Sequence, residues 1–416
     1  MNPSSLYSFG FAMAALMCMI YREDWDMSTF SVLTFCIFIL GVPCFTLYNY
    51  LLFYYGKPVG NSTIKLDKMK RFTLENTLLM IFLFIQVVIL FMRFRFVMST
   101  TGLASLSAAL YDIRGSANQG FAYEIPLYLQ YLIEISDILT YYFGFVTAKM
   151  YVNQEKGSKR NLCLSIFVIG TLSSFFNGAK GTGLYFLIYY FIVWGIIYGR
   201  SKYRELEKTG QKKIVKILVV FILAVPAFSV LTSALGRTDS EEYSTMYILG
   251  IYCGSEIRNL DIVLNEPASK NVKWGEYTFR RYNSRDRKDI LDDFQSNHWI
   301  NGYYTGNVSS CLQFYYQDFG VTGVVLLVLF MAVIMGLLYI KSLKTQVLKR
   351  KNFSYAIFLF AYLGRGVAYS FFSERFYQQF LYNLVTIRLL ILIALLSWLI
   401  EQNSPKKINK YQYGIK

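Results

Sequence analysis

The sequence predicts an all-α protein that crosses a membrane about ten times. Hydrophobic residues make up 55% of the 416 residues and charged residues only 16%, and a soluble domain cannot bury that much apolar surface. The apolar residues form runs close to the ~20 residues that a helix needs to cross a bilayer. One long polar stretch, residues 235–317, interrupts this pattern. We therefore expect two groups of membrane helices with one large loop between them.

The apolar runs define the predicted spans and divide the chain. The spans cover residues 5–21, 29–54, 74–94, 124–148, 161–177, 181–198, 215–234, 318–340, 353–372 and 376–400. The chain therefore divides into residues 1–234 with seven helices, the loop 235–317, residues 318–400 with three helices, and a basic tail at 401–416. No positive residues of a signal peptide precede the first run, so we expect it to be retained. Apolar residues at helical spacing predict an amphipathic surface helix over residues 101–119.

Basic residues sort the connections between spans into two alternating sets. The connections at 57–71, 149–160, 200–216 and 341–351, together with the tail, hold 25 Lys and Arg. The short connections on the opposite side are poor in basic residues, and Arg93 is counted among these few. Because cytoplasmic connections carry the excess of Lys and Arg, both termini are predicted to be cytoplasmic and the large loop to lie outside. The net charge of +16 is thereby explained without nucleic acid, since no basic stripe lies beside stacking aromatics.

Charged side chains inside the predicted spans need a reason, because a charge in the bilayer is costly. Glu134 and Asp137 are three residues apart in the fourth span, on one helical face, and Arg388 is in the last span. One of the two acids is predicted to pair with Arg388 and hold the bundle together. The alternative is that the acids line a proton path or a glycan-binding cavity.

Several cations stand where an anion would bind at the outer surface. Lys180 is in the Gly-rich turn 177–183 that opens the sixth span, where free backbone N–H groups favour an anion. Arg237 follows the seventh span directly, at the same depth, and Arg365 is in the outer half of the ninth span. Cations at headgroup depth suit a lipid-linked diphosphate. The simpler alternative for Lys180 is snorkelling to the interface.

The large loop supplies further binding candidates. Residues 243–264 have apolar residues at helical spacing and predict a helix against the membrane, with Arg258 as a further diphosphate ligand. A dense basic cluster includes Arg280 and Arg281, and it is either a solvated charged face or a binding site for an acidic glycan or phosphate. Tyr304 and Asn307 complete the predicted glycan-binding set.

His298 is the first candidate for a general base. It is the only histidine in the chain, it lies in the large loop, and histidine is the side chain that changes charge near neutral pH. Asp239, which we assign to the catalytic group with Arg237, competes for this role, as do Glu241, Glu242 and Asp261. No nucleotide-phosphate or metal-binding motif is present, so we expect neither a cofactor nor a metal.

Three segments carry a resemblance to a known family. Asn-Gly-Ala-Lys-Gly-Thr-Gly-Leu at 177–184 opens a span, Leu-Gly-Arg at 235–237 opens the outer loop, and residues 307–323 close it. In these features the chain resembles the Wzy-type O-antigen and capsule polysaccharide polymerases, and it is more distantly similar to the O-antigen ligases. Lys180 stands where arginine is commoner in the family. Asn307 stands where the ligases place a histidine, which favours a polymerase.

The resemblance implies glycosyl transfer at the outer face of a bacterial inner membrane. The growing glycan on undecaprenyl diphosphate would be the donor, and the non-reducing end of a lipid-linked repeat unit would be the acceptor. Besides the lipid bilayer, a flippase and a chain-length regulator are the implied partners. The alternatives are an O-antigen ligase and a non-enzymatic flippase or transporter of lipid-linked oligosaccharides. A purely structural membrane subunit is disfavoured by Lys180 and Arg237.

Overall fold

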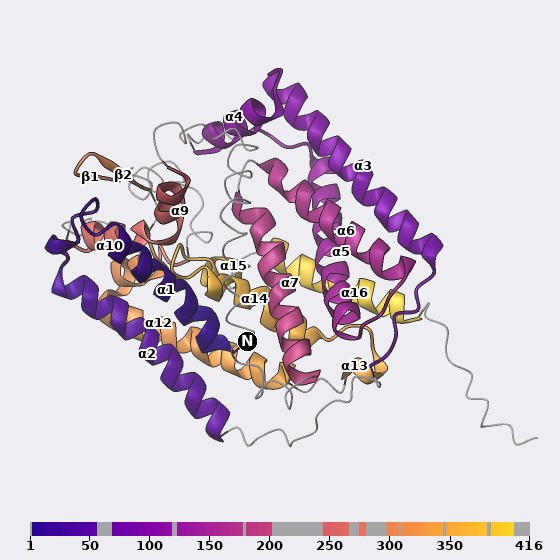
Figure 1. Cartoon of the computed structure of the whole chain (residues 1–416). Helices are drawn as coiled ribbons and strands as arrows, with labels where there is room; N and C mark the ends of the chain where they lie inside the picture. The colour runs from indigo at the N-terminus through magenta and orange to yellow at the C-terminus, as the bar shows by residue number, and fades with distance from the viewer. Residues whose placement is uncertain are drawn as a thin grey trace, which may run out of the picture.

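The computed structural model describes most of the chain, and the described part is almost entirely helical (Figure 1). The described residues are 2–55, 69–118, 123–177, 180–201, 244–265, 274–279, 298–307, 309–343, 347–380 and 384–402. The predicted seventh span at 215–234 lies outside these ranges, and so do Arg237, Asp239, Arg280 and Arg281.

Nine long helices overlap ranges that were predicted as spans. They are α1 (Pro3–Ile20), α2 (Val32–Tyr55), α3 (Asn76–Thr101), α5 (Leu127–Val152), α6 (Ser158–Ser174), α7 (Lys180–Ser201), α12 (Cys311–Ser342), α14 (Tyr355–Ala368) and α16 (Leu384–Gln402). Six of them, α1, α2, α3, α7, α12 and α16, are long and apolar enough to cross a membrane, while α14 is a shorter apolar helix. These helices confirm the predicted class, an all-α membrane protein.

Shorter elements join the long helices. They are η1 (Met27–Thr29), α4 (Leu106–Asn118), η3 (Phe175–Asn177), α9 (Thr245–Cys253), α10 (Ser255–Asn265), β1 (His298–Ile300), β2 (Tyr303–Gly306), α13 (Val347–Arg350) and α15 (Phe376–Phe380). The amphipathic helix predicted at 101–119 is confirmed as α4, which buries Ala109 and Leu110 against α3 and η3. The helix predicted at 243–264 is two helices, because the chain turns at Gly254 where that residue packs tightly on α1.

Alternate connections meet at one end of the bundle, which we call the basic end. The backbone N–H of Lys70 donates to the Leu348 carbonyl at 2.9 Å, and the Lys70 ammonium pairs with Glu401 at 2.6 Å. Lys149 Nζ donates to Asn352 Oδ1 at 3.2 Å. The connections after α2, α5 and α12 and the end of α16 therefore lie together, as the predicted alternation requires.

The remaining connections meet at the opposite end, which we call the cap end. There α9, α10 and the β1–β2 hairpin, together the cap, lie at the end of α1 away from the N-terminus (Figure 1). The backbone N–H of Ser31 donates to Asp261 Oδ1 of α10 at 2.9 Å. The backbone N–H of Cys311 donates to the Ser370 carbonyl at 2.9 Å, which places the start of α12 beside the end of α14.

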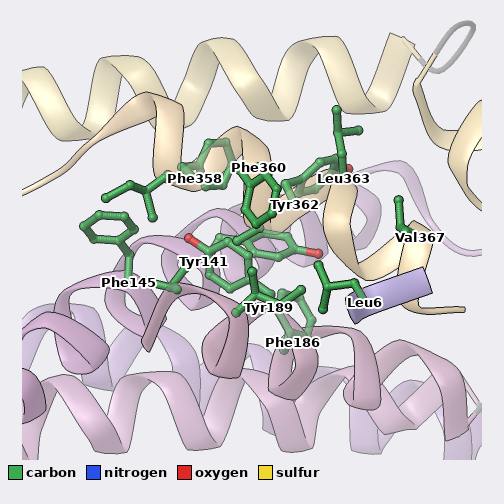
Figure 2. Packing of buried hydrophobic residues seen from close by; sticks show 14 of the residues in the cluster. Leu6, Tyr141, Phe145, Phe186, Tyr189, Phe358, Phe360, Tyr362, Leu363 and Val367 are labelled. Atoms are coloured by element: carbon green, nitrogen blue, oxygen red, sulfur yellow. The ribbon is translucent and has the colours of Figure 1, made fainter. Parts of the chain in front are cut away.

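A cluster of aromatic rings fills the space between α5, α7 and α14 (Figure 2). The Tyr141 ring lies 4.6 Å from Phe186, 4.9 Å from Tyr189 and 5.4 Å from Tyr362, measured between ring centroids. Such tilted and edge-on contacts are the favoured geometry for aromatic pairs. This packing fixes the three helices against one another and so positions Arg365.

Candidate functional site

Arg365 occupies a box of tyrosine rings near the cap end of α14. The residue is 6% exposed. Its Nε donates to the Tyr362 carbonyl at 3.0 Å, and Nη1 donates to the Tyr141 hydroxyl. The guanidinium carbon lies 4.0 Å from the ring centroid of Tyr362, 5.2 Å from that of Tyr141 and 5.3 Å from that of Tyr185. Stacking on aromatic faces stabilises a desolvated guanidinium, so the box holds a cation inside the bundle.

Arg93 is a second buried cation, and its placement corrects a prediction from the sequence. The charge pattern places Arg93 in a connection, but α3 continues to Thr101 and leaves Arg93 only 3% exposed inside the bundle. Its Nη1 donates to Ser173 Oγ of α6 at 3.4 Å. Asp137 of α5 is half-buried.

The pairing predicted for Arg388 is confirmed, and its partner is Glu134 rather than Asp137. Arg388 lies one turn into α16, near the cap end, and its guanidinium carbon is 5.5 Å from the centroid of the Tyr131 ring. The ion pair connects α5 to α16.

The start of α7 lies beside the connection between α14 and α15. Tyr185 packs edge-on against Tyr369 at 4.8 Å, and its hydroxyl interacts with the guanidinium of Arg375. The buried Nε of Arg375 has no hydrogen-bond partner among the described residues. Lys180 is the first residue of α7, five positions before Tyr185. Among the described residues, nothing lies within 4 Å of a Cβ built at Gly181.

A row of aromatic rings connects this neighbourhood to the cap. Tyr252 of α9 stacks on Phe372 at 6.1 Å, Phe372 contacts Tyr369 at 6.2 Å, and Tyr369 contacts Tyr185. All four side chains are half-buried, so each keeps some open surface. We call Tyr185, Tyr252, Tyr369 and Phe372 the aromatic row. These four residues could not be predicted from the sequence, because aromatic residues of the membrane interface show the same pattern there.

Arg258 of the cap uses its guanidinium within the protein. Nε donates to the Trp25 carbonyl at 3.0 Å, Nη2 donates to Thr29 Oγ1 at 2.7 Å, and Nη1 pairs with Asp261. These contacts fasten α10 to the connection between α1 and α2. We therefore leave Arg258 out of the proposed diphosphate site, where the sequence analysis had placed it.

Asp261, the partner of Arg258, is held in its charged form by hydrogen bonds from Ser31 and Thr34. Its Oδ1 accepts from the Ser31 N–H and from Thr34 Oγ1, the latter at 2.6 Å. Burial raises the pKa of Asp261, but these hydrogen bonds and the charge of Arg258 outweigh it and hold the pKa below its ordinary value. A carboxylate held in this way is a weak candidate for a general base.

The hairpin carries the predicted residues His298 and Tyr304. Asn301 and Gly302 both have positive φ, 50° and 83°, which is the geometry of the tight Asn-Gly hairpin turn. His298 is half-buried and pairs with Gly306 across the hairpin. Tyr304 is half-buried against Trp299, with ring centroids 5.2 Å apart, and Trp299 is 58% exposed. The hairpin therefore presents an exposed aromatic side chain next to the candidate base.

The candidate residues fall into two groups, one in the bundle and one on the cap. The bundle group contains Arg93, Asp137, Arg365 and Arg375, with Lys180 at the start of α7. The cap group contains His298, Trp299 and Tyr304, followed by the half-buried Asn307. Among the described residues the aromatic row lies between α9 of the cap and the bundle group. No three His, Cys, Asp or Glu side chains in the described ranges could hold a metal ion together.

Comparison with known proteins finds no relative of this chain. No family model matches the chain, and no match is found among curated proteins or among solved structures. The family resemblance therefore rests on the three sequence segments given above and stays a prediction.

Proposed function

We propose that this chain is a glycosyltransferase that polymerises lipid-linked repeat units at the outer face of a bacterial inner membrane. It would move the growing glycan from undecaprenyl diphosphate to the non-reducing end of an incoming lipid-linked repeat unit. The observation that carries the proposal is the collection of basic residues at the cap end of the bundle. Arg365 and Arg375 adjoin Tyr185 there, and α7 starts at Lys180.

A lipid diphosphate explains why cations gather at this depth. Arg365 is three residues from the end of α14, which at ~1.5 Å per residue puts it within about 5 Å of the helix end. A diphosphate leaving group gains negative charge as its bond to the sugar breaks, and fixed cations stabilise that charge. Arg237 would join these cations, because the sequence places it directly after the predicted seventh span.

The aromatic row and the cap suit the glycan. Sugar rings present apolar C–H faces that pack on aromatic side chains, and hydroxyl groups that hydrogen-bond to tyrosine. The row leads from Arg365 towards α9, and Trp299 and Tyr304 offer a further aromatic pair on the hairpin. Arg280, Arg281 and Asn307 remain proposed glycan contacts.

In the proposed transfer step, one glycosidic bond forms as the bond between the donor sugar and the diphosphate breaks. The oxygen of the acceptor hydroxyl attacks the anomeric carbon of the donor sugar, and the bond between that carbon and the diphosphate oxygen breaks. The hydroxyl proton passes to His298, with Asp239 as the competing base, and undecaprenyl diphosphate leaves with the bonding electrons. Lys180, Arg365 and Arg375 stabilise the leaving group.

The proposal requires the cap to lie outside the cytoplasm, with both termini and the basic end inside. The described part of the basic end contains Lys70, Lys149 and Arg350, which is the charge bias expected of the cytoplasmic side. Alkaline phosphatase fused within the 280–297 segment should be active, and a fusion after residue 402 should be inactive. The reverse pattern would reject the proposal.

Product length tests the activity directly. Lys180→Ala, Arg237→Ala and Arg365→Gln should insert normally and yield mainly single repeat units on the carrier lipid. Arg22→Gln is the matched control, because the Arg22 side chain is 72% exposed at the cap end and outside the proposed site. It should give normal chains. Long chains at normal levels in all three site variants would refute the proposed site.

The same experiment separates the remaining alternatives. An O-antigen ligase would transfer finished chains to the lipid A core and leave repeat-unit polymerisation intact when it is deleted. A flippase would be required for the repeat unit to reach the outer leaflet at all, so its loss would remove extracytoplasmic substrate. A polymerase variant instead accumulates outward-facing single repeat units.

A further inference from the structure

Glu256 carries a carboxyl group that is buried between the cap and the bundle. It lies in the first turn of α10, and α10 packs against α1, α2 and α12 (Figure 1). Residues four apart on a helix share a face, so Glu256 lies on the face of α10 that carries Leu260 and Leu264. Those two leucines belong to the apolar core of the bundle. Glu256 is 0% exposed, so the closed cap holds it away from water.

Neither oxygen of the Glu256 carboxyl has a hydrogen-bond partner among the described residues. The polar side chains next to it on α10 bind elsewhere. Ser255 Oγ donates to the Thr305 carbonyl at 2.5 Å, and Asn259 Nδ2 donates to the same carbonyl at 2.9 Å. Arg258 is two positions further on, a spacing at which side chains do not face each other, and its guanidinium contacts the connection between α1 and α2. Within the described ranges, no hydrogen bond or ion pair therefore compensates a charge on Glu256.

The protonated form of Glu256 is the one that fits this place. Taking an ionised carboxylate out of water without a partner costs far more than the positive end of a helix returns. Burial accordingly raises the pKa of Glu256 well above its ordinary value, and the residue's own backbone N–H offsets only part of this rise. A cap that is closed over Glu256 therefore holds a proton that an open cap releases near neutral pH.

We propose that the cap closes only over protonated Glu256, so that release of this proton opens the cap. By linkage, a group whose pKa is higher in the closed state stabilises that state at low pH, and the stabilisation is lost as the pH rises. Closure also places Tyr252 of α9 on Phe372. The proton on Glu256 therefore decides whether the aromatic row is complete, whatever reaction the protein performs.

The other ionisable groups around α10 must be separated from Glu256. Asp261 keeps its charge near neutral pH, because its pKa lies below the ordinary value. Burial raises the pKa of Cys253 in α9 to about 12, so that thiol stays neutral. Further ionisable side chains of the elements packed against α10, and of the connection between α1 and α2, are Cys18, Tyr21, Arg22, Glu23, Asp24, Asp26, Tyr247, Tyr303, Tyr304, Cys311 and Tyr315.

Two further groups at the cap end change charge in the same pH range as the proposed switch. His298 is in the hairpin that packs on α10, and histidine ordinarily changes charge near neutral pH. Glu374 accepts a hydrogen bond from Tyr315 of α12, and burial raises its pKa to about 7. Each of these residues is therefore replaced in a variant of its own.

The experiment measures the distance between two spin labels on the full-length protein in detergent, from pH 5 to pH 9. One label replaces Met246 of α9 and the other replaces Leu326 of α12, which are both exposed, through unnatural amino acids that leave the cysteines in place. In the wild type, the ratio of open to closed molecules should rise about tenfold for each pH unit until the pH reaches the pKa of the closed state. Glu256→Gln has no proton to release, so its ratio should stay constant and its cap closed.

Glu23→Gln is the matched control, because its side chain is 85% exposed at the same end of the molecule. This variant should keep the pH dependence of the wild type, and so should His298→Gln and Glu374→Gln. The inference is overturned by a constant ratio in the wild type, by equal slopes in the wild type and Glu256→Gln, or by a slope lost in His298→Gln or Glu374→Gln. Glu256→Met, which is uncharged and of similar size, gives the second reading by the same criteria if the Gln variant aggregates. Since no glycan or lipid diphosphate is added, these outcomes leave the proposed function untouched.

Discussion

Removal of Arg258 should release the cap from the bundle. The Arg258–Asp261 pair is 10% and 2% exposed at its side chains, and breaking a buried pair by removing one partner costs about 3–5 kcal/mol. Asp261 keeps the Ser31 N–H and Thr34 hydroxyl as donors in Arg258→Ala. We therefore expect the lower value, ~3 kcal/mol, as the loss in the free energy that holds the cap closed.

Cys18 reports cap opening directly. The residue is buried under the cap, and its Sγ donates to the Gly254 carbonyl at 3.2 Å. In a variant whose other cysteines are replaced by alanine, a thiol-reactive maleimide should label Cys18 only after the cap opens. A loss of ~3 kcal/mol corresponds to about a 100-fold higher open population and labelling rate.

Labelling within threefold of the background variant would refute this account of Arg258. The control is Arg22→Ala, which removes an exposed cation from the same end and should leave the rate unchanged. If Arg258 bound a diphosphate instead of holding the cap closed, its replacement would give a different result. Loss of farnesyl diphosphate binding with unchanged Cys18 labelling would return Arg258 to the predicted diphosphate site.

Three further changes test other parts of the structure. Burial raises the pKa of Glu374 to about 7, so the stabilisation by its protonated form is complete below the unfolded pKa of ~4.3 and is lost as the pH rises to 7. The melting temperature of Glu374→Gln should therefore rise relative to that of the wild type between pH 5 and 8. A constant difference between the two melting temperatures would contradict this. Gly170→Ala should destabilise the bundle by ~2 kcal/mol, because the new Cβ collides with the Thr140 hydroxyl that Gln86 binds. Thermal unfolding measures this loss, and an unchanged melting temperature would refute the prediction. Gly302→Val should disrupt the hairpin turn, since φ is 83° there, and faster proteolysis of the cap at unchanged bundle stability would confirm it.

The sequence predicted the membrane class and the positions of most helices because the bilayer sets the length of an apolar run. It also predicted that Arg388 pairs with an acid of the fourth span, since an unpaired charge there is costly. The choice of Glu134 over Asp137 could not be predicted. That choice depends on how α16 packs against α5, which the sequence does not show.

The sequence failed where tertiary packing gives a residue its role. The helix predicted to lie against the membrane at 243–264 carries Arg258 and Asp261 at i and i+3, a spacing that indicates a pair within one helix. The sequence does not reveal that this pair is buried against the connection between α1 and α2. In the same way, Arg93 looks like the end of a span, and only the extension of α3 to Thr101 buries it.

Photo-crosslinking with a benzophenone analogue of a polyprenyl diphosphate tests the central claim most directly. The account predicts that the label maps to the start of α7, near Lys180, and to residues 365–377, and that unlabelled undecaprenyl diphosphate competes for it. Arg365→Gln should remove most of the label from both segments. Labelling confined to the basic end, around Lys70 and Lys149, or labelling that undecaprenyl diphosphate does not compete away, would contradict the account.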